Sequence, residues 1–164
     1  MDDFALLATE LGAVLKARGL MLALAESCTG GLVGATITEI PGSSAWFERG
    51  FVTYSNAAKM EMLGVSAETL EKFGAVSEET AREMAHGALK HSHANVAISI
   101  TGIAGPDGGT PEKPVGTVCF AWVYVNKVYA DKIISATKKI SGNRQQIRHL
   151  SVETALRELL KLLA

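Results

Sequence analysis

Residues 20–31 read LMLALAESCTGG, an apolar run followed by a Glu-Ser-Cys-Thr sequence and a pair of glycines. The run from Leu20 to Ala25 is typical of a short buried strand. A helical pattern then extends to about Ile40 and stops before Pro41-Gly42. A buried strand, a glycine turn and a helix in this order indicate a protein that alternates strands with helices.

The rest of the chain repeats this alternation and ends with a hairpin. Helices are expected at about 3–18, 55–64, 66–74, 77–91 and 143–163, and strands at 50–54, 95–100, 115–125 and 128–136. Asn126-Lys127 lies between the last two strands as a turn signal. The pattern predicts one three-layer α/β/α domain over residues 1–164, with a mixed, mostly parallel sheet of about five strands.

Composition narrows the class of protein. The chain has 164 residues, 48% of them hydrophobic, which is enough for one domain with its own core. Sixteen basic and 17 acidic residues give a net charge of −1, which argues against a nucleic-acid or anionic-membrane partner. No apolar run approaches the roughly 20 residues that span a bilayer, and Met1-Asp2-Asp3 is acidic where a signal peptide is basic. We therefore expect a cytoplasmic protein.

Chemically capable side chains gather in three segments that follow predicted strands. These segments are residues 26–31, 54–59 and 101–114. In open α/β sheets, ligands bind in the crevice beyond the carboxyl ends of the strands. The three segments are therefore expected to meet at one site.

Ser27 is the candidate nucleophile of the first segment. A helix that begins near Gly30 would point free N–H groups at the same space, where they could hold a phosphate or an oxyanion. An equally open interpretation is a helix-capping serine followed by two packing glycines. Cys28 is a rival nucleophile, although a small buried cysteine is the more frequent case.

Lys59 is the candidate base of the second segment. A lysine in the first turn of a helix is disfavoured by the helix dipole, and burial would lower its pKa further. Such an amine can act as a general base, and Tyr54 could relay a proton or donate a hydrogen bond. The alternative is that Lys59 extends to solvent and Tyr54 only packs.

The third segment is a glycine-rich loop beginning at Thr101, whose spacing matches neither the Walker nor the dinucleotide-binding pattern. It could form an anion-binding nest or serve only as a turn-rich connection. Arg144 and Arg148 share one helix face and could clamp a phosphate, or be ordinary surface arginines. His91 and His93 have no third ligand at a suitable spacing, so no metal site is predicted.

Several strings together resemble the CinA C-terminal domain family. They are Ala25–Gly31 (AESCTGG), Tyr54-Ser55-Asn56 with Lys59, Gly74–Ser77 (GAVS), Thr101–Gly109 (TGIAGPDGG), Val115–Val118 (VGTV) and Gly142-Asn143-Arg144. The resemblance covers nearly the whole chain and includes no preceding domain. It therefore implies the stand-alone form, the nicotinamide-nucleotide amidases.

The resemblance implies a three-layer α/β/α fold and a reaction without metal or cofactor. Nicotinamide mononucleotide and water would give nicotinic acid mononucleotide and ammonia, with Ser27 as nucleophile, Lys59 as base and Tyr54 assisting. The expected substrate-binding residues are Glu26, Thr29, Gly30, Gly31, Thr101, Gly102, Ala104, Gly105 and Arg144. From the sequence alone Glu26 could instead orient Lys59 or pair with a cation.

The alternative function is a non-catalytic nucleotide-binding or competence- and DNA-repair-associated regulatory module. Exposed strand edges and a leucine-rich last helix make a homo-oligomer the expected assembly.

Overall fold

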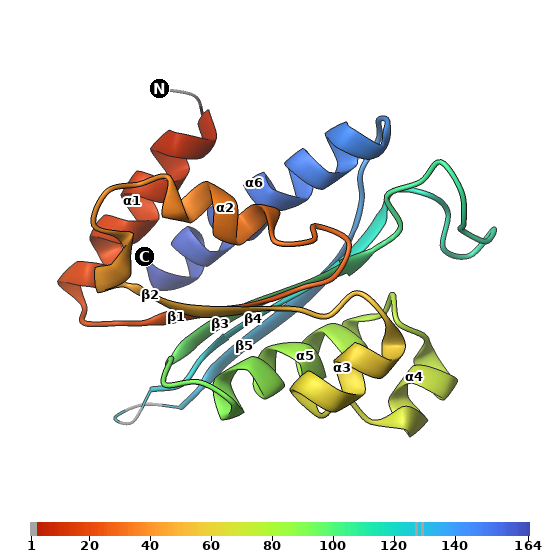
Figure 1. The fold of residues 1–164 in the computed structure, drawn as a ribbon, viewed down its shortest axis with the longest axis horizontal. Helices are drawn as coiled ribbons and strands as arrows, with labels where there is room; N and C mark the ends of the chain where they lie inside the picture. The colour runs from red at the N-terminus through yellow and green to blue at the C-terminus, as the bar shows by residue number, and fades with distance from the viewer. Residues whose placement is uncertain (1–2, 127, 129) are drawn as a thin grey trace.

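The described residues form one five-stranded sheet, with the strand order β2-β1-β3-β4-β5 (Figure 1). The computed structural model describes residues 3–126, 128 and 130–164. The strands are β1 (Leu22–Glu26), β2 (Phe47–Val52), β3 (Val96–Gly102), β4 (Thr117–Tyr124) and β5 (Lys132–Lys139). β1 pairs in parallel with β2 and β3, whereas β4 is antiparallel to both β3 and β5. Only β4 therefore runs against the other four strands, and the predicted mixed, mostly parallel sheet is confirmed.

Helices cover both faces of this sheet (Figure 1). One layer contains α1 (Asp3–Ala17), α2 (Leu32–Thr38) and α6 (Arg144–Leu163). The other contains α3 (Asn56–Leu63), α4 (Ala67–Phe73) and α5 (Glu78–Lys90). A short 3-10 helix, Ser43–Ala45, precedes β2. The three-layer α/β/α prediction is confirmed.

Several helices start at the capping residues expected from the sequence. The hydroxyls of Ser55, Ser66 and Ser77 each accept a hydrogen bond from the backbone N–H three residues later. Asn143 and Gln146 form a reciprocal capping box at the start of α6. Capping satisfies N–H groups that have no partner within a helix, so these positions mark the helix starts in the sequence as well.

Two predicted strands are displaced from their observed positions. β2 begins at Phe47 and ends at Val52, whereas residues 50–54 were predicted. The first half of β2 contains the charged residues Glu48 and Arg49, which are tolerated because β2 is an edge strand. A strand with charged residues is not recognised as an apolar run, so this half was not predicted. β5 begins at Lys132, not at residue 128. The predicted two-residue turn includes Lys127, which lies outside the described residues.

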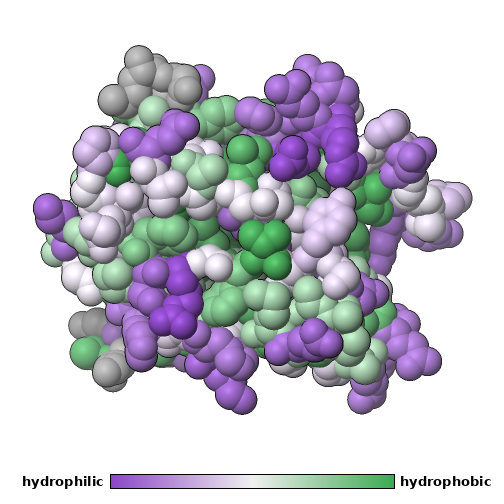
Figure 2. Space-filling view, in the orientation of Figure 1, coloured by the Kyte–Doolittle hydropathy of each residue, from purple (hydrophilic) through white to green (hydrophobic). Residues whose placement is uncertain are grey.

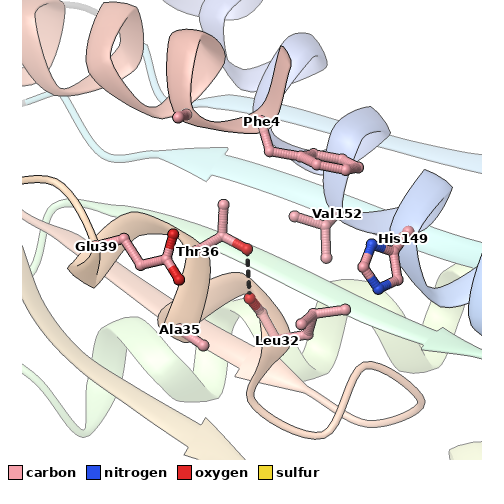
Figure 3. A pocket seen from close by; sticks show the side chains of 8 residues that line it. Phe4, Leu32, Ala35, Thr36, Glu39, His149 and Val152 are labelled. Atoms are coloured by element: carbon pink, nitrogen blue, oxygen red, sulfur yellow. Dashed lines mark hydrogen bonds between the residues drawn. The ribbon is translucent and has the colours of Figure 1, made fainter. Parts of the chain in front are cut away.

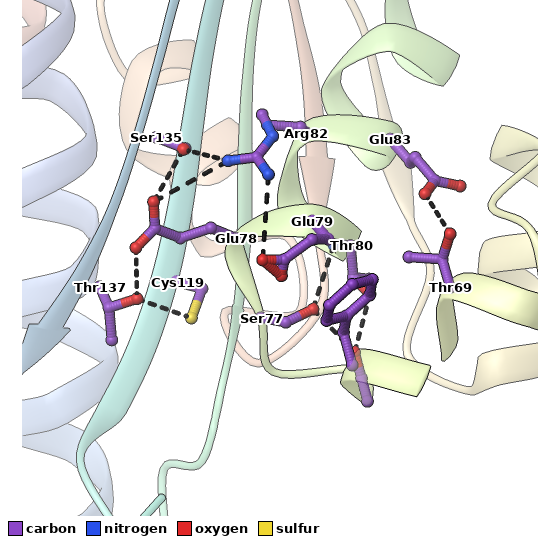
Figure 4. A network of polar contacts seen from close by, with 12 residues as sticks. Thr69, Ser77, Glu78, Glu79, Thr80, Arg82, Glu83, Cys119, Ser135 and Thr137 are labelled. Carbon is purple, nitrogen blue, oxygen red and sulfur yellow. Dashed lines mark hydrogen bonds and ion pairs between the residues drawn. The ribbon is translucent and has the colours of Figure 1, made fainter. Parts of the chain in front are cut away.

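The N-terminus of α5 is tied to β5 by a polar network (Figure 4). The Glu78 carboxylate accepts hydrogen bonds of 2.8 Å from both Ser135 Oγ and Thr137 Oγ1. These bonds lower the pKa of Glu78, because they favour the ionised carboxylate. The network fixes one end of the helix that covers this face of the sheet.

The surface shown in Figure 2 is apolar across its middle, between the two helical layers, and hydrophilic toward its edges. Exposed apolar side chains include Val52 on the edge strand β2. In the part of the chain that the structure describes, no helix combines the length and hydrophobicity needed to cross a bilayer.

Candidate active site

Ser27 and Lys59 meet beyond the carboxyl end of β1. Ser27 follows the last residue of β1, and Lys59 lies in the first turn of α3. The Lys59 Nζ and Ser27 Oγ atoms are 3.1 Å apart, a hydrogen bond between residues 32 positions apart in sequence. This distance allows direct proton transfer without a relay.

Lys59 is held on its other sides by backbone carbonyls. Its Nζ also lies 3.1 Å from the carbonyl oxygens of both Thr53 and Tyr54. The side chain is 1% exposed, and this burial lowers the pKa of Lys59. A neutral amine has two N–H donors and one lone pair. The two carbonyls can take both donors, which leaves the lone pair for the Ser27 proton.

Ser27 and Lys59 line a cavity of about 160 Å³ at the rim of the sheet. Of the residues predicted for the site, Ser27, Tyr54, Lys59, Thr101, Gly102, Ala104 and Arg144 line it. The three segments that follow β1, β2 and β3 therefore meet, as the strand-end argument expects.

Arg144 and Tyr54 lie together on one side of this cavity. Arg144 donates a 2.6 Å hydrogen bond to the Gly105 carbonyl and a 3.3 Å bond to the Tyr54 hydroxyl. The Tyr54 side chain is 63% exposed, and its phenol forms no hydrogen bond with Ser27 or Lys59. Tyr54 therefore contacts Lys59 through its backbone carbonyl and Arg144 through its phenol.

Glu26 has a different position from the one expected. Its carboxylate is buried and accepts hydrogen bonds from the N–H groups of Val33 (2.9 Å) and Gly34 (3.0 Å). It therefore caps α2, with no bond to Lys59, and it is not among the residues that line the cavity. Carboxylates are favoured at helix N-termini because they satisfy unpaired N–H groups there.

The start of α2 is consequently not an open anion site. Leu32 N–H donates to the Thr29 carbonyl, and the next two N–H groups are taken by Glu26. The expectation of free donors at the helix start is wrong, because a buried carboxylate one residue before Ser27 already occupies them. Thr29, Gly30 and Gly31 form the turn between Ser27 and this helix and do not line the cavity.

Cys28, the rival nucleophile, also lines the cavity, but its thiol is poorly suited to attack a carbonyl carbon. Burial raises the pKa of its thiol from the ordinary value to about 12, so the thiol is protonated at neutral pH. Ser27, which contacts the Lys59 amine directly, is the better candidate nucleophile of the two.

His91 ends α5, and its Nδ1 lies 2.9 Å from the Gly87 carbonyl. In the described ranges, no group of three His, Cys, Asp or Glu side chains is arranged to hold a metal ion.

A separate cavity of about 170 Å³ lies between α1, α2 and α6, with Phe4, Leu32 and His149 on its walls (Figure 3). None of its lining residues belongs to the Ser27 cavity.

Three residues that line the Ser27 cavity had no functional role in the sequence interpretation: Asn56, Ala75 and Val76. Asn56 was considered only as a helix cap, and the other two carry no polar side-chain group. The Thr53 carbonyl was not predicted either, because every residue type has a backbone carbonyl and the sequence therefore does not show which one accepts a hydrogen bond. The recognisable Gly-Ala-Val-Ser string was the available signal for Ala75 and Val76.

Residues 5–163 match the CinA C-terminal domain. The chain belongs to the CinA C-terminal domain family. The chain is similar to proteins named nicotinamide-nucleotide amidohydrolase PncC. The one from Enterobacter agglomerans is 54% identical over 159 residues, or 94% of each chain. The one from Pseudomonas putida is 45% identical over 162 residues, or 99% of this chain and 98% of the relative.

A solved structure that is similar in sequence has the same fold. The competence/damage inducible protein CihA from Agrobacterium tumefaciens is 48% identical, with a TM-score of 0.91 over 99% of this chain and 96% of that chain. The shared fold therefore extends over nearly the whole chain.

Proposed function

We propose that this chain is a nicotinamide-nucleotide amidohydrolase that converts nicotinamide mononucleotide and water to nicotinic acid mononucleotide and ammonia. The observation that carries the proposal is the 3.1 Å contact between Ser27 Oγ and the buried Lys59 Nζ. The names of relatives that align along nearly the whole chain supply the substrate.

Acylation begins with proton transfer from Ser27 to neutral Lys59. Ser27 Oγ attacks the carboxamide carbon, and the carbonyl oxygen becomes an oxyanion. Cys28 lines the cavity, and its backbone N–H group is the candidate donor that stabilises this charge. Lys59 then passes its proton to the amide nitrogen, the C–N bond breaks, and ammonia leaves an acyl-enzyme.

Deacylation repeats these steps with water as the nucleophile. Lys59 accepts a proton from water, the hydroxide adds to the acyl carbon, and the proton returns to Ser27 Oγ as the ester bond breaks. The cavity of about 160 Å³ receives the pyridine ring. Arg144, which forms no ion pair with any described carboxylate, is the candidate phosphate contact. A cytoplasmic location and a homo-oligomeric assembly stay predictions from the sequence.

The test is ammonia release from nicotinamide mononucleotide by the purified chain, with and without chelator. Ser27→Ala removes the nucleophile and should lower kcat by about 10³-fold or more. Cys28→Ala is the matched control and should keep most of the activity. A Ser27→Ala variant with more than about a tenth of the wild-type rate would exclude covalent catalysis by Ser27. Binding of the nucleotide by the wild type without turnover would favour the regulatory-module alternative.

A further inference from the structure

From the lining of the Ser27 cavity, we infer that Val76 is a specificity-determining residue, whose side chain limits the size of the ring that the substrate carries. The inference rests on the proposed amidohydrolase function, in which this cavity receives the pyridine ring. Val76 lies in the segment between α4 and α5. It and two alanines, Ala75 and Ala104, are the aliphatic side chains of the lining. A flat apolar ring packs against such groups, and Val76 is the largest of the three.

Val76 also separates the Ser27 cavity from a second cavity. The second cavity, of about 340 Å³, lies where the start of α5 faces β4 and β5 (Figure 4). Three consecutive residues divide the two linings. Ala75 lines the Ser27 cavity, Ser77 lines the second cavity, and Val76 lines both. A shorter side chain at position 76 would therefore let a longer ring system extend into the second cavity.

The backbone next to Val76 is held in place. The carbonyls of the three residues before it each accept a hydrogen bond from a side chain. The donors come from the glycine-rich loop, the start of α5 and β3, and the bonds are Lys113 Nζ to Phe73 (2.7 Å), Ser77 Oγ and Thr80 Oγ1 to Gly74 (2.9 and 2.7 Å), and Thr101 Oγ1 to Ala75 (2.9 Å). Val76 itself packs against an apolar cluster that includes Met84 of α5. The segment therefore cannot move aside for a larger ring without breaking these contacts.

Gly74 fixes the path of the segment further. Its φ of 80° and ψ of 169° lie in a region that essentially only glycine adopts. Two hydroxyls hold its carbonyl in this conformation. A cavity wall that is fixed in this way excludes a substrate by size, whereas a mobile wall would adapt to it.

Removing the γ-methyl groups of Val76 should therefore change which carboxamides react. The probe is quinoline-3-carboxamide mononucleotide, in which a second ring is fused to the pyridine. The wild type should hydrolyse it poorly, because the second ring meets Val76. In Val76→Ala, the ratio of kcat/KM for this probe to kcat/KM for nicotinamide mononucleotide should rise by about 10-fold or more, since a methylene group in an apolar pocket changes discrimination by about 10- to 200-fold.

Two control variants separate the size of Val76 from its other effects. Val76→Thr keeps the branched shape and should keep the wild-type ratio. Val65→Ala truncates a valine that is buried in the same apolar cluster but lines neither cavity, and it should also keep that ratio. An unchanged ratio in Val76→Ala, or an equal rise in Val65→Ala, would overturn the inference.

A second readout separates this inference from the proposed function. A sulfonyl fluoride labels Ser27 as the Oγ–S bond forms, fluoride leaves and Lys59 takes the hydroxyl proton. Naphthalene-2-sulfonyl fluoride is larger than benzenesulfonyl fluoride by one fused ring, and the ratio of their labelling rates should rise by about 10-fold in Val76→Ala. If the wild type is labelled but releases no ammonia from nicotinamide mononucleotide, the proposed function fails and the labelling ratio still decides the role of Val76.

Val76→Ile tests the opposite direction and covers the case in which Val76→Ala does not fold. The added methyl group takes space from the ring, so both the kcat/KM ratio and the labelling ratio should fall below their wild-type values. Wild-type ratios in a folded Val76→Ile variant would overturn the inference.

Discussion

The Lys59 side chain is 1% exposed, and no carboxylate of the described residues forms an ion pair with it. Removing an ammonium group from water is costly, and a buried lysine responds by losing its proton more readily. Its neighbours are one hydroxyl and two carbonyls, all at 3.1 Å. This environment favours the neutral amine, which is the form that can accept the Ser27 proton.

The lowered pKa of Lys59 predicts the pH dependence of the reaction. Below this pKa the side chain is an ammonium ion that cannot accept a proton, so kcat should rise with pH and level off above it. Because burial disfavours the charged form, the midpoint should lie below the ordinary lysine value. A pH–kcat profile measures this directly.

Lys59→Arg provides the control for the assignment, because guanidinium stays protonated over the working pH range. The variant should lose activity by about 10²-fold or more, and the rising limb should disappear. A midpoint at the ordinary lysine value, or full activity in Lys59→Arg, would contradict the role of Lys59 as base.

At the scale of elements, α3 brings Lys59 to the site and α5 determines where α3 lies. Gly87 of α5 faces the C-terminal end of α3, where a Cβ atom would approach the Leu63 carbonyl oxygen to 2.0 Å. Real Cβ atoms do not approach so closely, so only glycine permits this packing distance. The separation of the two helices, and with it the position of Lys59, depends on a missing side chain.

Gly87→Ala should therefore lower both stability and kcat. Overpacking costs about 1–3 kcal/mol, against which the helix preference of alanine contributes about 1 kcal/mol. Urea unfolding and ammonia release measure the two effects. His86→Ala, at an exposed neighbouring position, is the matched control. A more stable Gly87→Ala with wild-type kcat would show that α3 does not depend on this contact.

At the scale of the whole molecule, one apolar cluster packs on each face of the sheet. The larger cluster joins α1, α2 and α6 to the sheet and includes Leu11. The smaller one packs α5 and the end of α3 on the opposite face, and includes Leu63 and Met84. The Ser27 cavity lies at the rim where these layers end. Stability and catalysis should therefore be separable by substitutions deep in the larger cluster.

Leu11→Ala should lower the free energy of unfolding by about 2–5 kcal/mol, because it opens a cavity in this cluster. Its kcat and KM should equal the wild-type values at a temperature at which the variant stays folded. Leu6→Ala on the same helix is the control: Leu6 is 50% exposed, so its stability should change by less than about 0.5 kcal/mol. Urea unfolding followed by circular dichroism provides the measurement. A large loss of kcat in folded Leu11→Ala would show that the cluster also shapes the site.

Much of the fold follows from patterns between near neighbours in sequence. Apolar periodicity and the serine caps at Ser55, Ser66 and Ser77 predict the helices, because these signals depend on residues three or four positions apart. The buried strands β1 and β3 are recognisable as apolar runs. The edge strand β2 is poorly predicted, because its polar half lies outside the core.

Sequence patterns alone sufficed to predict the three-layer class, the serine-capped helix starts and the three segments that meet at the site. The contacts of each polar group became known only from the packed fold. Glu26 caps α2 and leaves the substrate to other residues, Lys59 reaches Ser27 directly, and Arg148 holds a turn 120 residues away in sequence. Secondary structure depends on interactions between neighbours in the chain, whereas these contacts depend on how the helical layers pack against the sheet.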